Sequence, residues 1–324
     1  MMNQVLDIKN LSVDFDGFRA VSDAELTLGK GKVLGIVGES GSGKSVTMLA
    51  MMGLIPYPGI IKADTLFFNG HDLLKMSGRK KRKITGKEIA MIFQEPMTSL
   101  NPCFTVEFQL TEALKIHEGG AKKERQKKAV ALLKQVGIPA AEDRMKSFPH
   151  QLSGGISQRV MIAMAIACNP TLLIADEPTT ALDVTIQAQI LDLLIGLQKK
   201  NDMALILITH DMAVIAETVE DVVVMYAGQV VEKNSADNIF TGPRHPYTEA
   251  LLNSLPERNI DSKRLPTIPG VVPGKHDRPQ GCLFHPRCTY AKEKCIAAPP
   301  VLTQKGDGAF RCHFPLIDGI PLHE

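Results

Sequence analysis

Apolar and polar residues alternate along the start of the chain, and shorter, wholly apolar runs follow. The alternation over residues 6–28 predicts half-buried antiparallel strands, with residues 5–8 and 11–15 as the first two. Apolar runs predict further strands at residues 33–37, 66–68, 89–93, 172–175 and 204–208. A hairpin is predicted for residues 222–232 around Ala227-Gly228.

Helical spacing appears between these runs. It predicts amphipathic helices at residues 107–117 and 124–136, and a buried helix at residues 160–168. Buried strands that alternate with helices are typical of α/β proteins. We therefore expect a mostly parallel core sheet, an antiparallel β subdomain and a helical subdomain.

The amino-acid composition changes after about residue 234. More than half of the 20 prolines lie at or beyond Pro243, and helical periodicity is weak there apart from residues 247–255. These features predict a main domain over residues 1–234, with its helical subdomain at about residues 97–160. A small extension is predicted over residues 235–324.

Composition narrows the possible functions. The chain has 324 residues, 44% of them hydrophobic, so a sizeable core is available. The net charge of +2 gives no reason to expect a nucleic-acid partner. We find neither a secretory signal nor an apolar run of membrane-spanning length. The protein is expected to be soluble by itself, or attached to a membrane only through partners.

Residues 38–45 carry the first chemical motif. Their sequence, Gly-Glu-Ser-Gly-Ser-Gly-Lys-Ser, fits the phosphate-loop pattern and lies between a predicted strand and a predicted helix. Backbone N–H groups in such a loop surround phosphates, and the helix dipole adds positive charge. Lys44 can reach the terminal phosphates, and the Ser45 hydroxyl can bind Mg²⁺.

Two acidic residues end the apolar run at residues 172–175. A carboxylate at the tip of a buried strand can meet a phosphate-bound metal, which is the role expected for Asp176. Glu177 would polarise the attacking water as a general base. Nucleotide hydrolysis is therefore the predicted chemistry.

A second anion site is predicted at residues 152–155, where Leu-Ser-Gly-Gly precedes an apolar helix. The phosphate loop already cradles a nucleotide within the chain. A second cradle indicates a nucleotide that is held by another subunit.

Together these residues resemble the ATPase subunits of ABC transporters. Gln94 resembles the Q-loop, residues 181–183 (Ala-Leu-Asp) resemble the D-loop, and His210 resembles the switch histidine. Residues 93–102 and 244–248, the Pro-Gly segment at 269–274 and four late cysteines resemble the oligopeptide and dipeptide importer branch. The motifs of the ATPase cover residues 5 to about 232.

The resemblance implies a role for each site residue. Lys44 would grip the β- and γ-phosphates, while Ser45, Asp176 and Gln94 would hold Mg²⁺. Glu177, Gln94 and His210 would be catalytic, with His210 on the γ-phosphate. Phe15 would stack on adenine, with Phe18 as a rival. The remaining nucleotide-binding residues would be Gly38, Ser40, Gly41 and Gly43 of the loop, Asp183, and the segment Ser153, Gly154 and Gly155, which would close on the ATP bound to the opposite subunit.

Two positions depart from the family pattern. Ile156 stands where the signature segment usually has Gln, which removes one polar group near the expected subunit interface. Phe15 stands where Tyr is common, and it keeps the aromatic face. We expect neither change to abolish ATP binding.

Four cysteines close to the C-terminus predict a metal site: Cys282, Cys288, Cys295 and Cys312. Four thiolates can bind Zn²⁺ or a [4Fe–4S] cluster, and spacing alone leaves both open, along with free thiols. The family resemblance favours the iron–sulfur cluster.

The resemblance also implies partners and a location. The chain would be an ATPase beneath a permease at the cytoplasmic face of the bacterial inner membrane, pairing with a related ATPase and two transmembrane subunits. A separate peptide-binding protein would deliver the solute. Dipeptides are the expected cargo, with longer peptides, haem and nickel complexes as alternatives. A soluble ABC ATPase of translation or DNA repair and a non-hydrolysing structural subunit are the rival classes.

Overall fold

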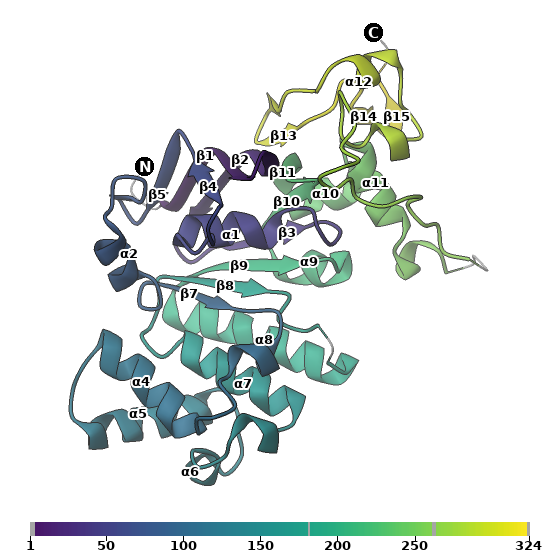
Figure 1. Ribbon diagram of the computed structural model, residues 1–324. Coiled ribbons are helices and arrows are strands. Elements are labelled where there is room, and N and C mark those ends of the chain that lie inside the picture. Colours follow the sequence, from purple (N-terminus) through teal and green to yellow (C-terminus); the bar gives the residue numbers. More distant parts are fainter. Residues whose placement is uncertain (1–3, 181, 261–263, 323–324) are drawn as a thin grey trace. The chain divides into compact units, whose positions relative to one another are not determined.

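The computed structural model describes residues 4–180, 182–260 and 264–322 (Figure 1). The chain divides into two compact units. The first comprises Met1–Val5, Gly29–Lys32 and Lys75–Leu207. The second comprises Leu6–Leu28, Val33–Leu74 and Ile208–Glu324. Ala181, part of the predicted D-loop, lies outside the described residues.

Two parallel strands lie in the core of the first unit. β7 (Ile89–Ile92) pairs with β8 (Leu172–Asp176) in register from Ile89↔Leu172 to Ile92↔Ala175. β9 (Ala204–Thr209), which belongs to this unit as far as Leu207, follows β8 in the sheet order. All residues of these strands are buried, as their apolar sequences predict.

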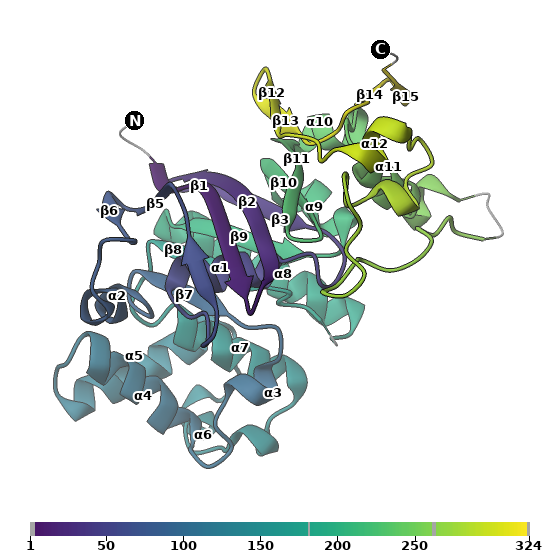
Figure 2. The same cartoon turned by 45° about the horizontal axis from the view of Figure 1, so that its top comes forward.

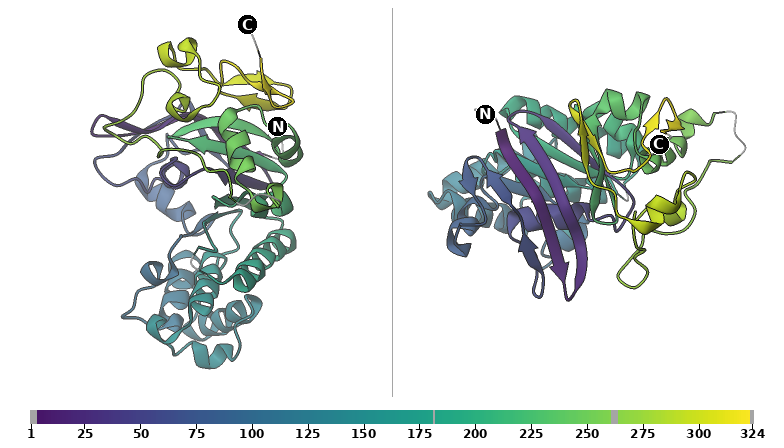
Figure 3. Two further views of the ribbon diagram at one scale, coloured as in Figure 1. Left: turned by 90° about the vertical axis from the view of Figure 1, so that its right-hand side faces the viewer. Right: turned by 90° about the horizontal axis from the view of Figure 1, so that it is seen from above.

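Helices make up the rest of the first unit. α4 (Val106–His117) begins after Thr105, whose hydroxyl accepts the Phe108 N–H at 3.3 Å. α4 packs on α5 (Lys122–Gln135) and on α7 (Gly154–Ala165), and the left panel of Figure 3 shows this helical region. The others are α2 (Gly78–Ile84), α3 (Pro96–Ser99), α6 (Ala141–Arg144), η1 (Pro149–Gln151) and α8 (Val184–Asn201).

The second unit contains the antiparallel sheet, in the order β2-β1-β5-β6 with β4 beside β1 (Figure 2). The prediction of two strands over residues 5–15 is wrong, because β1 runs unbroken from Gln4 to Phe15. Asn10 takes a positive φ of 52°, which Asn tolerates, so the strand continues through it. The other strands are β2 (Phe18–Gly29), β4 (Ile60–Lys62), β5 (Thr65–Phe68) and β6 (His71–Asp72).

A second set of strands in this unit supports the phosphate loop. β3 (Val33–Val37) pairs in parallel with β10 (Asp221–Tyr226), and β10 forms the predicted hairpin with β11 (Gln229–Ser235). The C-terminal region adds β13 (Gly308–Phe310) to the edge of β11, and β12 (Thr303–Lys305) pairs with β13. The extension therefore continues a sheet that the main domain begins.

Short elements complete the second unit: α1 (Lys44–Met52), α9 (Met212–Thr218), α10 (Ala236–Thr241), α11 (Pro246–Asn253), η2 (Pro256–Arg258), η3 (His285–Arg287), α12 (Glu293–Ala297), β14 (Leu316–Ile317) and β15 (Ile320–Pro321). Among the described residues, every helix is too short or too polar to cross a bilayer. The predicted combination of a mostly parallel core with an antiparallel β layer and a helical part is confirmed.

Candidate nucleotide site

The phosphate loop lies between β3 and α1 in the second unit. Gly38 follows β3 directly with a φ of 147°, and a Cβ there would come within 2.1 Å of the Met225 carbonyl oxygen. Only glycine fits so close to another backbone. Gly41 and Gly43 also take positive φ angles, and Ser40 is exposed between them and the strand. The sequence therefore folds locally into the open loop that its motif predicts.

Lys44 begins α1, and its side chain turns back over the loop. Its Nζ donates hydrogen bonds to the Gly38 carbonyl at 2.6 Å and to the Glu39 carbonyl at 3.0 Å. The residue is only 5% exposed. Ser45, the next residue, is half-buried. A loop of backbone amides with an ammonium group folded over it suits the phosphates of a nucleotide.

The turn between β10 and β11 contacts the phosphate loop and supports it. The Gly228 N–H donates to the Ser42 carbonyl at 2.9 Å, and the Gly228 carbonyl accepts the Ser22 N–H at 2.8 Å. A Cβ at Gly228 would lie 2.2 Å from the Ala20 carbonyl oxygen. The sequence predicts only a hairpin at Gly228, because the contacts of Gly228 with residues 20–42 join segments that are far apart in the chain.

The acidic pair lies at the end of β8 in the first unit. Asp176 is 6% exposed, and Glu177 follows with a positive φ of 45°. The Glu177 carboxylate accepts Gln94 Nε2 at 2.9 Å and Thr180 Oγ1 at 3.0 Å through the same oxygen, Oε2. The structure thus brings together Glu177 and Gln94, two residues that the sequence predicts to be catalytic.

The Ser-Gly-Gly segment begins α7 in the same unit. Ser153 and Gly154 are exposed, while Gly155 and Ile156 are half-buried. Further along α7, Gln158 Nε2 donates to the Pro178 carbonyl at 2.7 Å. This bond links the signature helix to the segment that follows the acidic pair.

Three predicted residues lie apart from these groups. Asp183 is exposed at the start of α8, and His210 is exposed just after β9. The ring of Phe15, at the end of β1, is half-buried. The rival aromatic residue, Phe18, has the Arg278 guanidinium 5.4 Å from its ring centroid.

The predicted site residues divide between the two units. The second unit holds Phe15, the loop at residues 38–45 and His210. The first unit holds Gln94, the acidic pair Asp176-Glu177, the segment at residues 152–155 and Asp183.

The four late cysteines line one small cavity, together with His245, Phe284 and other aromatic residues. The Cys282 N–H donates to the Cys295 carbonyl at 2.8 Å. Burial raises the pKa of the Cys282 thiol, of Cys288 to about 11 and of Cys312 to about 12. Within the described residues, no three His, Cys, Asp or Glu side chains are arranged to hold a metal ion. The cavity thus gathers four cysteines, three of them with raised pKa values, without forming a finished metal site.

The fold and the loop define a P-loop nucleotide-binding protein, and comparison with known sequences defines it further. The profile described as "ABC transporter" matches residues 21–180, and the profile "Oligopeptide/dipeptide transporter, C-terminal region" matches residues 231–295. The Dipeptide transport ATP-binding protein DppD of Escherichia coli is 59% identical over 97% of this chain and 98% of its own length. DppD of Haemophilus influenzae is 59% identical over 96% of each chain.

Solved structures agree with the sequence relatives. The ATP-binding cassette MJ0796, in a dimeric structure bound to ADP and Pi, is 28% identical, with a TM-score of 0.62 over 71% of this chain and 98% of its own. CbiO1 from Clostridium perfringens is 27% identical, with a TM-score of 0.62 over 74% of this chain and 92% of its own. The chain belongs to the ABC transporter ATP-binding proteins with the oligopeptide/dipeptide C-terminal region. It is an ABC-type ATPase, so its reaction is the hydrolysis of ATP.

Proposed function

We propose that this chain is the ATP-hydrolysing subunit that powers dipeptide import through a bacterial inner-membrane permease. The observation that carries the proposal is the 59% identity to DppD, which extends over 97% of this chain. A second support is the C-terminal region, whose profile is described by oligopeptide and dipeptide transport.

ATP would bind first to the phosphate loop. Lys44 would release the two carbonyls that it now contacts and turn to the β- and γ-phosphates, while the loop N–H groups bind the remaining oxygens. Phe15 would stack on adenine, because the face of Phe18 lies against Arg278. Mg²⁺ would supply charge neutralisation at the phosphates, with Ser45, Asp176 and Gln94 as its ligands.

Hydrolysis would depend on the acidic pair. Glu177 would polarise the attacking water, and Gln94 and Thr180 hold its carboxylate in place. His210 would contact the γ-phosphate. Each of these groups acts on charge that develops during phosphoryl transfer, so their positions matter more than any covalent step.

A second, related ATPase would complete the site. Ser153, Gly154, Gly155 and Asp183 would close on the ATP held by the partner, and the exposure of Ser153, Gly154 and Asp183 leaves them accessible to it. ATP binding and hydrolysis would alternate closed and open pairs, which two permease subunits would read as outward- and inward-facing states. The protein would sit peripherally at the cytoplasmic membrane face, served indirectly by a peptide-binding protein.

The cysteine cavity would hold a [4Fe–4S] cluster, with Zn²⁺ as the alternative occupant. Its support is the common lining by Cys282, Cys288, Cys295 and Cys312. Because burial raises the pKa of Cys282, Cys288 and Cys312, metal binding would release protons from these three thiols. The cluster would organise residues 235–324, which we propose as a C-terminal extension of the nucleotide-binding domain at 1–234.

The proposal is tested on the intact complex in liposomes that contain dipeptide and its binding protein. Wild-type hydrolysis should rise when dipeptide is added, and Glu177→Gln should lower turnover by roughly a hundredfold or more while ATP stays bound. The exposed Glu217→Gln is the matched control and should hydrolyse normally. Stimulation by longer peptides, haem or nickel instead of dipeptides would reassign the cargo, and full turnover by Glu177→Gln would refute the catalytic role.

A further inference from the structure

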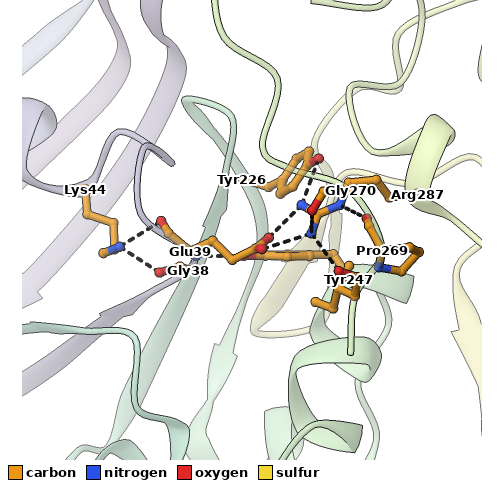
Figure 4. A network of polar contacts seen from close by, with 9 residues as sticks. Gly38, Glu39, Lys44, Tyr226, Tyr247, Pro269, Gly270 and Arg287 are labelled. Carbon is orange, nitrogen blue, oxygen red and sulfur yellow. Dashed lines mark hydrogen bonds and ion pairs between the residues drawn. The ribbon is translucent and has the colours of Figure 1, made fainter. Parts of the chain in front are cut away.

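One ion pair joins the C-terminal extension to the phosphate loop. Arg287 donates from Nη1 to Glu39 Oε2 at 2.7 Å and from Nη2 to Glu39 Oε1 at 2.9 Å, which makes the pair bidentate (Figure 4). Glu39 is the second residue of the loop, and the two partners are 248 residues apart in the sequence. The side chain of Arg287 is 5% exposed and that of Glu39 is 31% exposed.

Arg287 makes further contacts besides this ion pair. Its Nε donates to the Pro269 carbonyl at 2.6 Å, and the guanidinium lies 5.7 Å from the ring centroid of Tyr226. Burial opposes the charge of Arg287, but hydrogen bonds with Glu39 and Tyr226 outweigh it and raise the pKa. The guanidinium is therefore a charged group held by contacts with both the extension and β10.

Glu39 is held at three points. Arg287 binds its carboxylate, its N–H donates to Tyr247 Oη at 2.9 Å, and its carbonyl accepts Lys44 Nζ (Figure 4). Tyr247 belongs to α11, so its hydroxyl comes from the extension as well. Burial raises the pKa of Tyr247, which keeps that hydroxyl protonated. A single residue of the phosphate loop thus connects the extension to the lysine expected to bind phosphate.

We propose that Arg287 is a positioning residue for ATP binding: it fixes the backbone of the phosphate loop and neutralises the carboxylate of Glu39. Both effects favour a polyanionic ligand. A fixed loop has less freedom to lose when the phosphates bind. A paired carboxylate repels those phosphates less than a bare one does.

The proposal depends on ATP binding by this ATPase and not on the identity of the imported solute. Affinity for ATP, measured by equilibrium binding, and the KM and kcat of hydrolysis by the intact complex are therefore suitable readouts. Arg287→Ala should raise both Kd and KM for ATP about tenfold, because removing one partner leaves a bare, partly buried charge. The kcat should change by less than about threefold, since Arg287 touches none of the groups expected at the reacting phosphate.

The two effects of Arg287 are separated by removing the carboxylate. Glu39→Gln alone should weaken ATP binding less than Arg287→Ala, because no bare negative charge remains. Adding Glu39→Gln to Arg287→Ala should then recover part of the lost affinity, which is a coupling between the two sites. Simple loss of structure predicts the opposite, a double variant that is worse than either single one.

A matched control is available in the same extension. Arg258 is exposed and donates to the Phe240 carbonyl, so Arg258→Ala removes an arginine without touching the loop. It should leave Kd and KM unchanged. If Arg287→Ala fails to fold, Glu39→Gln and the conservative Arg287→Lys carry the test, and Arg287→Lys should show an intermediate Kd. Wild-type affinity in Arg287→Ala, or additive losses in the double variant, would overturn the proposal even if dipeptide import is confirmed.

Discussion

The phosphate loop and the cysteine cavity both lie in the second unit, yet the chain builds them in different ways. The loop consists of eight consecutive residues, and its three glycines take the positive φ angles that such a turn needs, so much of its shape follows from the local sequence. The cavity draws four side chains from residues 282–312, and burial raises the pKa of Cys282, Cys288 and Cys312. Backbone N–H groups at a helix N-terminus form an anion site before any ligand arrives, whereas the buried thiols of the proposed metal site would have to lose protons when a metal binds.

Removing the lysine from the loop should have the largest effect. Lys44→Ala deletes the ammonium group that folds over the loop carbonyls and that we propose to bind the β- and γ-phosphates, so the charge that develops on the phosphates would lose this counter-charge. We expect ATP hydrolysis by the complex to fall roughly a hundredfold or more, measured as phosphate release. Lys30→Ala removes only an exposed ion pair with Asp202 and should retain activity. Normal turnover by Lys44→Ala would show that the loop is not the phosphate site.

The cavity should respond to the loss of one sulfur. Cys312→Ser removes a quarter of the proposed ligand set, so purified protein should lose its iron and its brown colour, while the exposed Cys103→Ser should keep both. Metal analysis and the visible spectrum measure this directly. Stoichiometric zinc in the wild type would show that the cavity binds zinc and not an iron–sulfur cluster. Equal metal content in both variants would show that the cavity is not a metal site.

The sequence predicts the local structure of a motif better than its distant contacts. The loop at residues 38–45 and the acidic pair at the tip of β8 were predicted because each motif carries its own strand and turn signals. The pairing of Glu39 with Arg287 was not, because periodicity says nothing about contacts between residues 248 positions apart. One signal was present: a carboxylate inside a phosphate-binding loop requires a cation nearby.

The fold shows the same limit. Apolar runs located β3, β8 and β9, since full burial requires apolar residues throughout. The edge strand β13 was missed because Gly308–Phe310 is too short to show any period, and its place beside β11 depends on pairing across the chain. Two strands were predicted at residues 5–8 and 11–15, but β1 runs through the residues between them, with Asn10 as a single left-handed residue.

Replacing Gly38 by alanine tests whether the backbone of the phosphate loop is rigid, as its comparison with the cysteine cavity implies. Gly38→Ala would place a Cβ 2.1 Å from the Met225 carbonyl oxygen at a φ of 147°. Either the loop or β10 must move, and we expect a loss of about 2–3 kcal/mol in the free energy of unfolding, together with weaker ATP binding. Chemical denaturation measures the first effect. Gly196→Ala, in the middle of α8 with open space around it, should instead stabilise by about 0.5–1 kcal/mol. Equal stability of the two variants would contradict a rigid loop.

His245 lies between the cysteine cavity and the residues that contact the phosphate loop. Its side chain lines the cavity, and its Nδ1 accepts the N–H of Tyr247 at 3.0 Å at the start of α11. The Tyr247 hydroxyl in turn accepts the Glu39 N–H of the loop. Complete burial lowers its pKa to about 3, with Arg311 adding a smaller repulsion and a backbone hydrogen bond at Arg311 opposing the shift. The unfolded chain, with a histidine pKa of about 6.5, binds more protons between these values. The stabilisation is therefore complete above about pH 6.5 and is lost as the pH falls toward 3, by at most about 1.4 kcal/mol per pH unit.

His245→Asn should remove this slope while keeping a side-chain acceptor for the Tyr247 N–H. The buried Glu232, which accepts the His245 N–H at 2.9 Å and has a pKa raised by burial, contributes the opposite slope in both proteins. The difference between wild type and variant therefore isolates the histidine. Denaturation midpoints at pH 5.0 and 7.5 provide the measurement: the wild type should lose more stability than the variant on acidification. If the wild type and His245→Asn lose equal stability on acidification, protonation of His245 does not destabilise the packing between the cavity and α11. His245 would then not couple the cysteine cavity to the phosphate loop.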